Sequence, residues 1–343
     1  MRRRTATICL TLALLLGSTG EGWSADFQKG VDAYKKEDYA TALREWKLAA
    51  EQGDAKSQYN LGQMNRKGQG VTHDYETAVK WYKLAAEQGH IKSQYNLAKL
   101  YLKGRGVSQN YESAVKWYGL AAEQGNIRAQ YNVGWMYRRG QGIPQNYETA
   151  AKWYELAAKQ GYAPAQYNLA RMYWKGLGVP QDDKTAVKWY SLAAEQGHTK
   201  SQYKLGWMYW KGRGVTRNYQ TALKWYRLAA EHGHASARYN LGRMYWKGLG
   251  VPQNNKIAVK WYRLAAEQGN APAQTGLGYM YDKGYGVKQD NVRAYIWYDI
   301  AVSLGYNDAK DDRDMVAKKL TPSQIERLVR LARKCVRKNY KGC

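Results

Sequence analysis

The pattern of hydrophobic and polar positions predicts two short helices in every block of 36 residues. In the block that follows Gly53, the segment from Ala55 to Lys67 places Leu61 and Met64 about one turn apart, which is typical of one helix face. A Gly-x-Gly sequence then stops this helix, because glycine gains little from a helical backbone. A second helix follows, with Ala, Trp and Tyr at helical spacing.

The second helix of each block begins and ends at recurrent residues. It starts at a slot that holds only Asp or Asn, whose side chains can accept hydrogen bonds from the free amides of a first turn. These N-cap residues are Asp38, Asp74, Asn110, Asn146, Asp182, Asn218, Asn254 and Asp290. It ends at a glycine, the expected left-handed residue after a helix. These glycines are Gly53, Gly89, Gly125, Gly161, Gly197, Gly233, Gly269 and Gly305.

A fixed period of this length indicates stacked repeats that share one elongated core, so we expect an all-α fold, an α-solenoid. The Gly-x-Gly-Val loop, the Trp of the second helix and the Ala-Ala-x-x-Gly ending resemble the Sel1-like repeat family, relatives of tetratricopeptide repeats, over about residues 54–305. The resemblance implies a right-handed superhelix of antiparallel helix pairs. It also implies that the first helix of each pair faces a concave, partner-binding side.

The repeats divide the chain into four segments. Residues 1–25 resemble a secretory signal peptide, residues 26–53 an N-terminal tetratricopeptide-like capping hairpin without the Gly-x-Gly loop, and residues 54–305 hold seven Sel1-like repeats. Residues 306–343 form a basic C-terminal capping helix and tail, with a helix expected from Pro322 to about Arg337 after the capping-box residues Thr321 and Gln324.

The first 25 residues predict export. Three arginines precede an apolar run from Ala6 to Leu16 that is too short to span a bilayer, and small residues follow. We expect cleavage between residues 20 and 25, a location in a bacterial periplasm or outside the cell, and no transmembrane segment afterwards. The exported chain keeps Cys335 and Cys343, for which we expect an intramolecular disulfide, with an intermolecular bridge as the alternative.

Slots that vary between copies are the candidates for specificity. In three consecutive copies the first helix carries Trp or Arg at two slots three residues apart, and then Lys, so that these side chains share a face. We call this set the aromatic-basic strip: Arg171, Trp174, Lys175, Trp207, Trp210, Lys211, Arg243, Trp246 and Lys247. Trp and Arg dominate protein interfaces. The alternative interpretation is that each Trp only covers a neighbouring loop.

Charge adds a second hypothesis. The formal charge is +26, which favours anionic partners or surfaces, but Glu76, Glu112 and Glu148 each precede a Lys by four residues and would pair locally. The C-terminal helix carries Arg327, Arg330 and Lys334 with little opposing charge and would suit an anionic lipid, glycan or acidic protein. Nucleic acid is disfavoured, because the export signal leads away from it and no binding motif is present.

The sequence offers no catalytic constellation, cofactor motif or metal site. His90, His198 and His234 occupy a slot that elsewhere holds Asp or Asn before the first helix, His232 replaces a Gln, and His73 lies in a loop. No paired metal spacing, nucleophile motif or phosphate loop occurs. Some cysteine-rich relatives are described as penicillin-binding or β-lactamase-like, but they carry a cysteine pair in each repeat, which these repeats lack.

We therefore expect a non-enzymatic periplasmic or secreted scaffold that binds a protein through the concave surface of its first helices. The first alternative is binding of a cell-envelope glycan or polyanion through the aromatic-basic strip. The second is a β-lactamase-like or peptidoglycan hydrolase.

Overall fold

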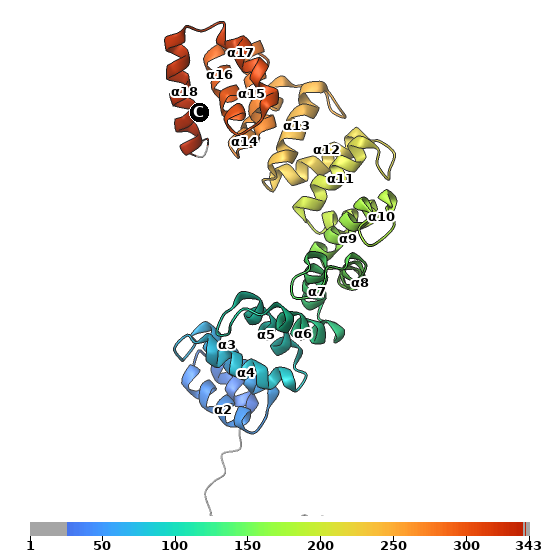
Figure 1. Cartoon of the computed structure of the whole chain (residues 1–343), viewed down its shortest axis with the longest axis vertical. Helices are drawn as coiled ribbons and strands as arrows, with labels where there is room; N and C mark the ends of the chain where they lie inside the picture. Colours follow the sequence, from blue (N-terminus) through green and yellow to red (C-terminus); the bar gives the residue numbers. More distant parts are fainter. Residues whose placement is uncertain (1–25, 339, 341–343) are drawn as a thin grey trace, which may run out of the picture. The chain divides into compact units, whose positions relative to one another are not determined.

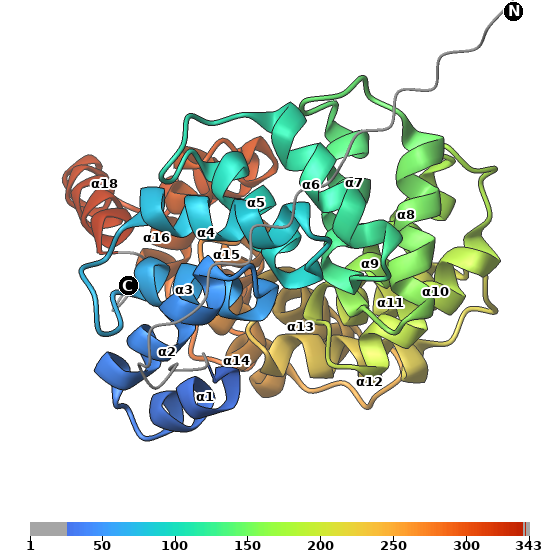
Figure 2. The same cartoon turned by 90° about the horizontal axis from the view of Figure 1, so that it is seen from below.

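The computed structural model describes residues 26–338 and residue 340, and within them the chain is all-helical, without a β-strand (Figure 1). The odd- and even-numbered helices of a repeat pack side by side, as α11 (Thr199–Lys211) and α12 (Tyr219–Glu231) do (Figure 2). The predicted α-solenoid fold is thereby confirmed. The predicted signal peptide lies outside the described residues.

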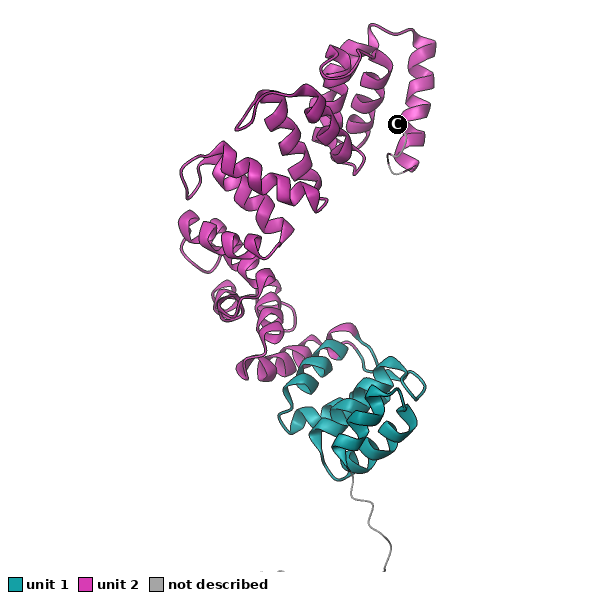
Figure 3. Cartoon of the chain, turned by 180° about the vertical axis from the view of Figure 1, so that it is seen from behind, with its two compact units in different colours: residues 1–100, 104–108 teal, residues 101–103, 109–343 magenta. Residues whose placement is uncertain are grey.

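The helices cluster into two compact units (Figure 3). Unit 1, residues 1–100 and 104–108, contains α1 (Phe27–Lys35), α2 (Tyr39–Glu51), α3 (Ala55–Lys67), α4 (Tyr75–Glu87) and most of α5 (Ile91–Lys103). Unit 2, residues 101–103 and 109–343, holds the remaining helices. Besides α11 and α12, these are α6 (Tyr111–Glu123), α7 (Ile127–Arg139), α8 (Tyr147–Lys159), α9 (Ala163–Lys175), α10 (Asp183–Glu195), α13 (Ala235–Lys247), α14 (Asn255–Ala266), α15 (Ala271–Lys283), α16 (Asn291–Ser303), α17 (Lys310–Ala317) and α18 (Pro322–Arg337).

The predicted N-caps of the even-numbered helices α2 to α16 are all present. Each of the eight Asp or Asn side chains accepts a hydrogen bond from a backbone amide in the first turn of its helix, as Asn110 Oδ1 does from Ser113 N at 2.8 Å. Such a cap contributes about 1 kcal/mol to helix stability. The same type of cap thus marks the start of all eight helices.

The Gly-x-Gly loops connect the two helices of a repeat and also contact the previous repeat. The first glycine of each loop ends an odd-numbered helix in the left-handed conformation, as Gly248 does with φ of 66°. The second glycine lies against the first turn of the preceding even-numbered helix: a Cβ on Gly250 would be 2.6 Å from the carbonyl carbon of Tyr219. Any side chain at this second position would push two repeats apart.

Inside each repeat, a tyrosine of the even-numbered helix fills the space beside the odd-numbered helix. Tyr226 is completely buried, and a Cβ on Gly206 would be 2.9 Å from its ring. Burial also raises the pKa of the equivalent Tyr154 to about 12, although the nearby Arg138 opposes this shift. Alanines such as Ala222 and Ala229 let the two helices approach closely around the ring.

The C-terminal cap follows the prediction in part. Helix α18 begins with the expected capping box of Thr321 and Gln324, and its Leu328 and Ala332 are buried against the last repeat. The short helix α17 before it was not predicted. A Lys319–Asp282 ion pair, with a distance of 2.6 Å between Nζ and Oδ1, ties the chain after α17 to α15.

Among the described residues, one of the three predicted Glu–Lys pairs lies within salt-bridge distance. Glu148 and Lys152 are 2.7 Å apart, whereas Lys116 lies over the ring of Trp117 at 5.4 Å. Both Glu148 and Lys152 are exposed, so their pair adds little to stability. In the described part of the chain, no helix is both long and apolar enough to cross a membrane.

Histidines cap two of the odd-numbered helices. His90 Nδ1 accepts a hydrogen bond from the amide of Ser93 at 3.3 Å, and His234 Nδ1 accepts from the amide of Ala237 at the same distance. The cap at His198 differs: its Nδ1 lies 2.9 Å from the Ser201 hydroxyl. Burial lowers the pKa of all three imidazoles below the ordinary value of 6.5, and Lys92 and Lys200 act in the same direction on His90 and His198.

The packing of the Tyr226 ring against Gly206 predicts a specific effect of Gly206→Val. Ala98 and Ala170 occupy the equivalent slot in two other repeats, so a single methyl group is accommodated there, but a branched side chain would collide with Tyr226. We expect Gly206→Val to lower the free energy of unfolding by about 1–3 kcal/mol, measured by urea denaturation. Gly119→Val on α6 is the matched control, because a Cβ there meets nothing within 4 Å. An equal loss of stability in both variants would contradict this role of the Tyr226 ring.

The histidine caps predict a pH-dependent stability. These imidazoles take up a proton near pH 6.5 in the unfolded chain, but only at a lower pH in the folded chain. The free energy of unfolding therefore falls as the pH drops below about 6.5. Replacing His90, His198 and His234 with Asn, the cap residue at position 126, should flatten the pH dependence of the urea midpoint between pH 7.5 and 5. His73→Asn is the control, because this exposed loop residue caps no helix. A slope unchanged in the triple variant would rule out this origin.

Candidate functional surface

The aromatic-basic strip lies on three odd-numbered helices of unit 2, namely α9, α11 and α13. Its four tryptophans and two arginines are half-buried, while Lys175, Lys211 and Lys247 are exposed at the last turn of each helix. The structure therefore brings the predicted residues onto one row of successive helices, each with part of its side chain accessible.

The strip residues contact one another across repeats. The rings of Trp174 and Trp207 meet edge to face with centroids 5.7 Å apart, and the guanidinium of Arg243 lies 4.9 Å from the ring centroid of Trp210. Trp246 meets Tyr279 of α15 in the same way at 5.5 Å. Each later slot thus contacts the earlier slot of the next repeat. These contacts are made with the odd-numbered helix of the next repeat and not with a loop.

The exposed lysines fold back over the same rings. The ammonium groups of Lys175, Lys211 and Lys247 lie 5.8, 5.4 and 5.2 Å from the ring centroids of Trp174, Trp210 and Trp246. Contacts of this kind between a cation and an aromatic face contribute about 0.5–1 kcal/mol at exposed sites. They place a positive charge beside every tryptophan of the later slot.

Lys204 belongs to this surface but was not predicted. It stands on α11 where most other repeats have Asn, as at Asn168 and Asn240, and its ammonium lies 4.6 Å from the ring centroid of Trp174. Burial lowers the pKa of Lys204, and the charges of Arg171 and Lys175 add to the shift. The replacement of Asn by Lys at this slot was the signal in the sequence.

The strip is strongly positive. Arg171, Lys175, Lys204, Lys211, Arg243 and Lys247 are its cations. None of them forms an ion pair with a carboxylate within the described ranges. A row of unpaired cations interleaved with aromatic rings favours a ligand that supplies negative charge and flat or apolar surface.

A small cavity adjoins the aromatic-basic strip. A cavity of about 170 Å³ lies at its end, between α13 and α15, and is lined by Trp246, Thr275 and Tyr279 among others. The predicted histidine roles hold at the helix caps described above, and His232 Nδ1 contacts the carbonyl of Leu228 at 2.8 Å. In residues 26–338 and 340, no group of His, Cys, Asp or Glu is arranged to hold a metal ion.

The two predicted disulfide cysteines are not both described. Cys335 lies half-buried near the end of α18, whereas Cys343 is outside the described residues. Their pairing stays a prediction.

Similarity to known proteins follows the repeat pattern. The Sel1 repeat model matches residues 55–90, 91–126, 127–162, 163–198, 199–234, 235–270 and 271–306. A Sel1 repeat protein from Oxalobacter formigenes is 35% identical, with a TM-score of 0.67, over 84% of this chain and 86% of that one. The protective antigen c5321 of uropathogenic Escherichia coli, which displays an SLR fold, is 32% identical, with a TM-score of 0.47, over 92% and 85% of the two chains.

No curated protein matches the chain. The Sel1 model, however, covers seven consecutive blocks and well over half of the residues, in register with the helix pairs and their glycine loops. The chain belongs to the Sel1 repeat family.

Proposed function

We propose that this chain is a non-enzymatic scaffold that holds an acidic protein partner on the aromatic-basic strip. Sel1 repeat proteins are generally protein-interaction scaffolds, and the family is typically non-enzymatic. The observation that carries the proposal is the ladder of half-exposed tryptophans on α9, α11 and α13, flanked by six cations without carboxylate partners in the described structure.

The ladder supports binding because it is already ordered. Trp174 is held by Trp207 and Lys204, and Trp210 by Arg243, so a partner would not have to immobilise these side chains itself. Binding to a preformed surface avoids much of the entropy cost of ordering an interface. Tryptophan and arginine are also the residues that most often dominate binding energy at interfaces.

A glycan or polyanion is the alternative ligand of the same strip, favoured by its six cations. The two ligands differ in their response to salt. A polyanion held mainly by charge loses affinity steeply as salt rises, because screening shortens the reach of each lysine and arginine. A protein that buries the tryptophan edges keeps most of its affinity at moderate salt.

We place the scaffold in a bacterial periplasm or outside the cell. Support comes from the basic and apolar residues of the first 25 positions, which resemble a signal peptide. The same oxidising location would favour a bridge between Cys335 and Cys343.

Truncation of the strip should abolish partner capture. We expect Trp174→Ala with Trp210→Ala to lose the proteins that the wild-type chain retains from a periplasmic extract at moderate salt, because removal of one such anchor costs about 2 kcal/mol or more. The measurement is crosslinking and pull-down followed by mass spectrometry.

The control is Trp189→Ala with Trp225→Ala, two half-buried tryptophans of the even-numbered helices α10 and α12. This variant should keep the partners, and circular dichroism should show both double variants folded. Identical partner sets for the wild type and the strip variant would disprove the strip as a binding surface. If the wild-type chain itself loses all partners at moderate salt, the result would favour the polyanion as the ligand instead.

Export and the disulfide are tested on the protein isolated from cells. Mass spectrometry of the periplasmic or secreted form should find an N-terminus between residues 21 and 26 and, without reductant, a linked peptide pair that contains Cys335 and Cys343. A full-length N-terminus in the cytoplasm would contradict export, and a disulfide-linked dimer would contradict the intramolecular bridge.

A further inference from the structure

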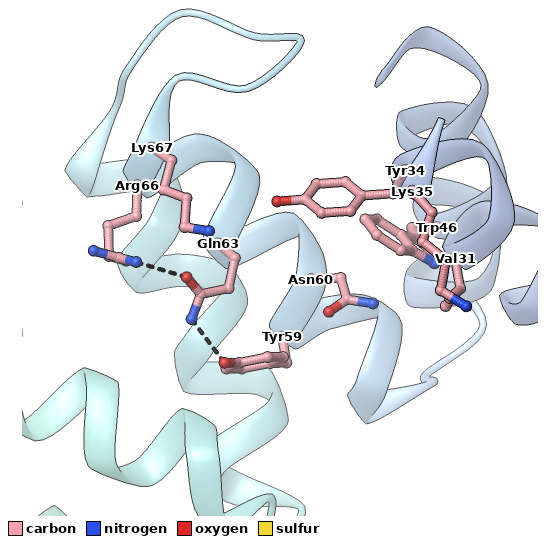
Figure 4. A pocket seen from close by; sticks show the side chains of 9 residues that line it. All are labelled: Val31, Tyr34, Lys35, Trp46, Tyr59, Asn60, Gln63, Arg66 and Lys67. Carbon is pink, nitrogen blue, oxygen red and sulfur yellow. Dashed lines mark hydrogen bonds between the residues drawn. The ribbon is translucent and has the colours of Figure 1, made fainter. Parts of the chain in front are cut away.

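A cavity of about 430 Å³ lies within unit 1, where the N-terminal hairpin meets the first repeat (Figure 4). Figure 4 shows Tyr34 and Trp46 on one side and Tyr59, Asn60 and Gln63 of α3 on the other. A cavity of this size falls in the range of small-ligand sites. It lies on helices that carry no residue of the aromatic-basic strip.

The charge of this cavity is entirely positive. Lys35, Arg66 and Lys67 line it, and no carboxylate does. Lys67 forms no ion pair with a described residue, and Lys35 makes one long ion pair, with 3.9 Å between its Nζ and Oδ1 of the exposed Asp32. Three cations around one small cavity that no carboxylate lines favour an anionic ligand.

Asn60 supplies a free amide. In a later repeat the equivalent Asn168 donates to the hydroxyl of Tyr131 at 3.4 Å. The N-terminal hairpin, which is shorter than a repeat, precedes Asn60 and places Tyr34 and Trp46 near it instead. Asn60 makes no hydrogen bond with a described residue, although it lines the cavity, so both its donor and its acceptor can serve a ligand.

Aromatic rings form the walls and are held in place. Trp46 is 3% exposed and packs against Tyr34 with centroids 5.4 Å apart, while the Tyr34 hydroxyl donates to Gln69 Oε1 at 2.6 Å. On the opposite side, Gln63 Nε2 donates to the Tyr59 hydroxyl at 2.8 Å. Arg66 in turn donates to Gln63 Oε1 at 2.7 Å. The walls therefore need little reorganisation on binding.

We propose that this cavity binds a carboxylated sugar unit, a pyranose of the uronic-acid type. The flat faces of Tyr34 and Tyr59 suit the apolar face of a pyranose ring, and the amides of Asn60 and Gln63 suit hydroxyl groups that both donate and accept. Lys35 and Lys67 supply charge-assisted hydrogen bonds to the carboxylate.

A peptide fits this cavity less well. Recognition of a peptide strand needs a free sheet edge, and recognition of a peptide helix needs a row of aliphatic pockets. The described residues of unit 1 form no strand, and Val31 is the one aliphatic residue among those that line the cavity. The cavity shares no residue with the aromatic-basic strip, so loss of one site leaves the other intact.

Calorimetric titration of the full exported chain tests the proposal. At low salt, trigalacturonate should bind with a dissociation constant on the order of millimolar or tighter. Uncharged maltotriose should bind at least about tenfold more weakly, because it leaves the cations unpaired. Triglutamate, with the same charge but no sugar ring, should also bind at least about tenfold more weakly than trigalacturonate.

Two variants and a matched control locate the site. Lys67→Gln and Asn60→Ala should each weaken trigalacturonate about tenfold, since each removes a hydrogen bond to the ligand. Lys47→Gln removes the same charge from an exposed position on α2 outside the cavity and should leave the affinity unchanged. No binding of trigalacturonate, equal binding of triglutamate, or equal weakening by Lys47→Gln would each overturn the proposal. Trp174→Ala with Trp210→Ala should not affect this titration.

Discussion

The close approach of a loop glycine to the preceding repeat is the constraint on which the stack depends. At Gly106, Gly142, Gly178, Gly214, Gly250 and Gly286, a side chain would collide with the backbone that opens the previous even-numbered helix. All six adopt positive φ, which glycine reaches without strain. Because this contact is made by backbone, it can recur in every repeat whichever residues occupy the variable slots of the odd-numbered helices.

That separation explains how the same helices can both build the core and vary. The invariant face of each odd-numbered helix holds Leu and Met in the core, as at Leu205 and Met208, beside a buried tyrosine. The two variable slots, three residues apart on another face of the helix, are not needed to form this part of the core. They still contact their neighbours, as Trp174 does Trp207, but those contacts bury only one part of each ring.

The sequence predicted the features that recur in every repeat. It did not predict the contacts between one repeat and the next. Caps such as Asn110 and loop glycines such as Gly250 are local features, because a first turn or a positive φ is decided within a few residues. The pairing of Trp210 with Arg243 joins slots 33 positions apart, so it depends on how two repeats stack. The contact of Lys204 with Trp174 also joins two repeats, so the sequence alone did not predict it. Helix α17 lies outside the periodic pattern, in a stretch where neither the spacing of apolar residues nor an N-cap residue predicted a helix.

Interruptions of the period also create the spaces that a ligand can enter. In the regular repeats, Tyr and Asn at adjacent slots of the odd-numbered helix fill the joint with the next repeat, as Tyr131 and Asn168 do. At Asn60 the preceding unit is a hairpin of different length, and a cavity of about 430 Å³ results. At α15 the pair is replaced by Thr275 and Gly276, and a cavity of about 170 Å³ appears beside them. A regular array presents a surface along its length, whereas these two cavities lie where the tyrosine–asparagine filling is broken.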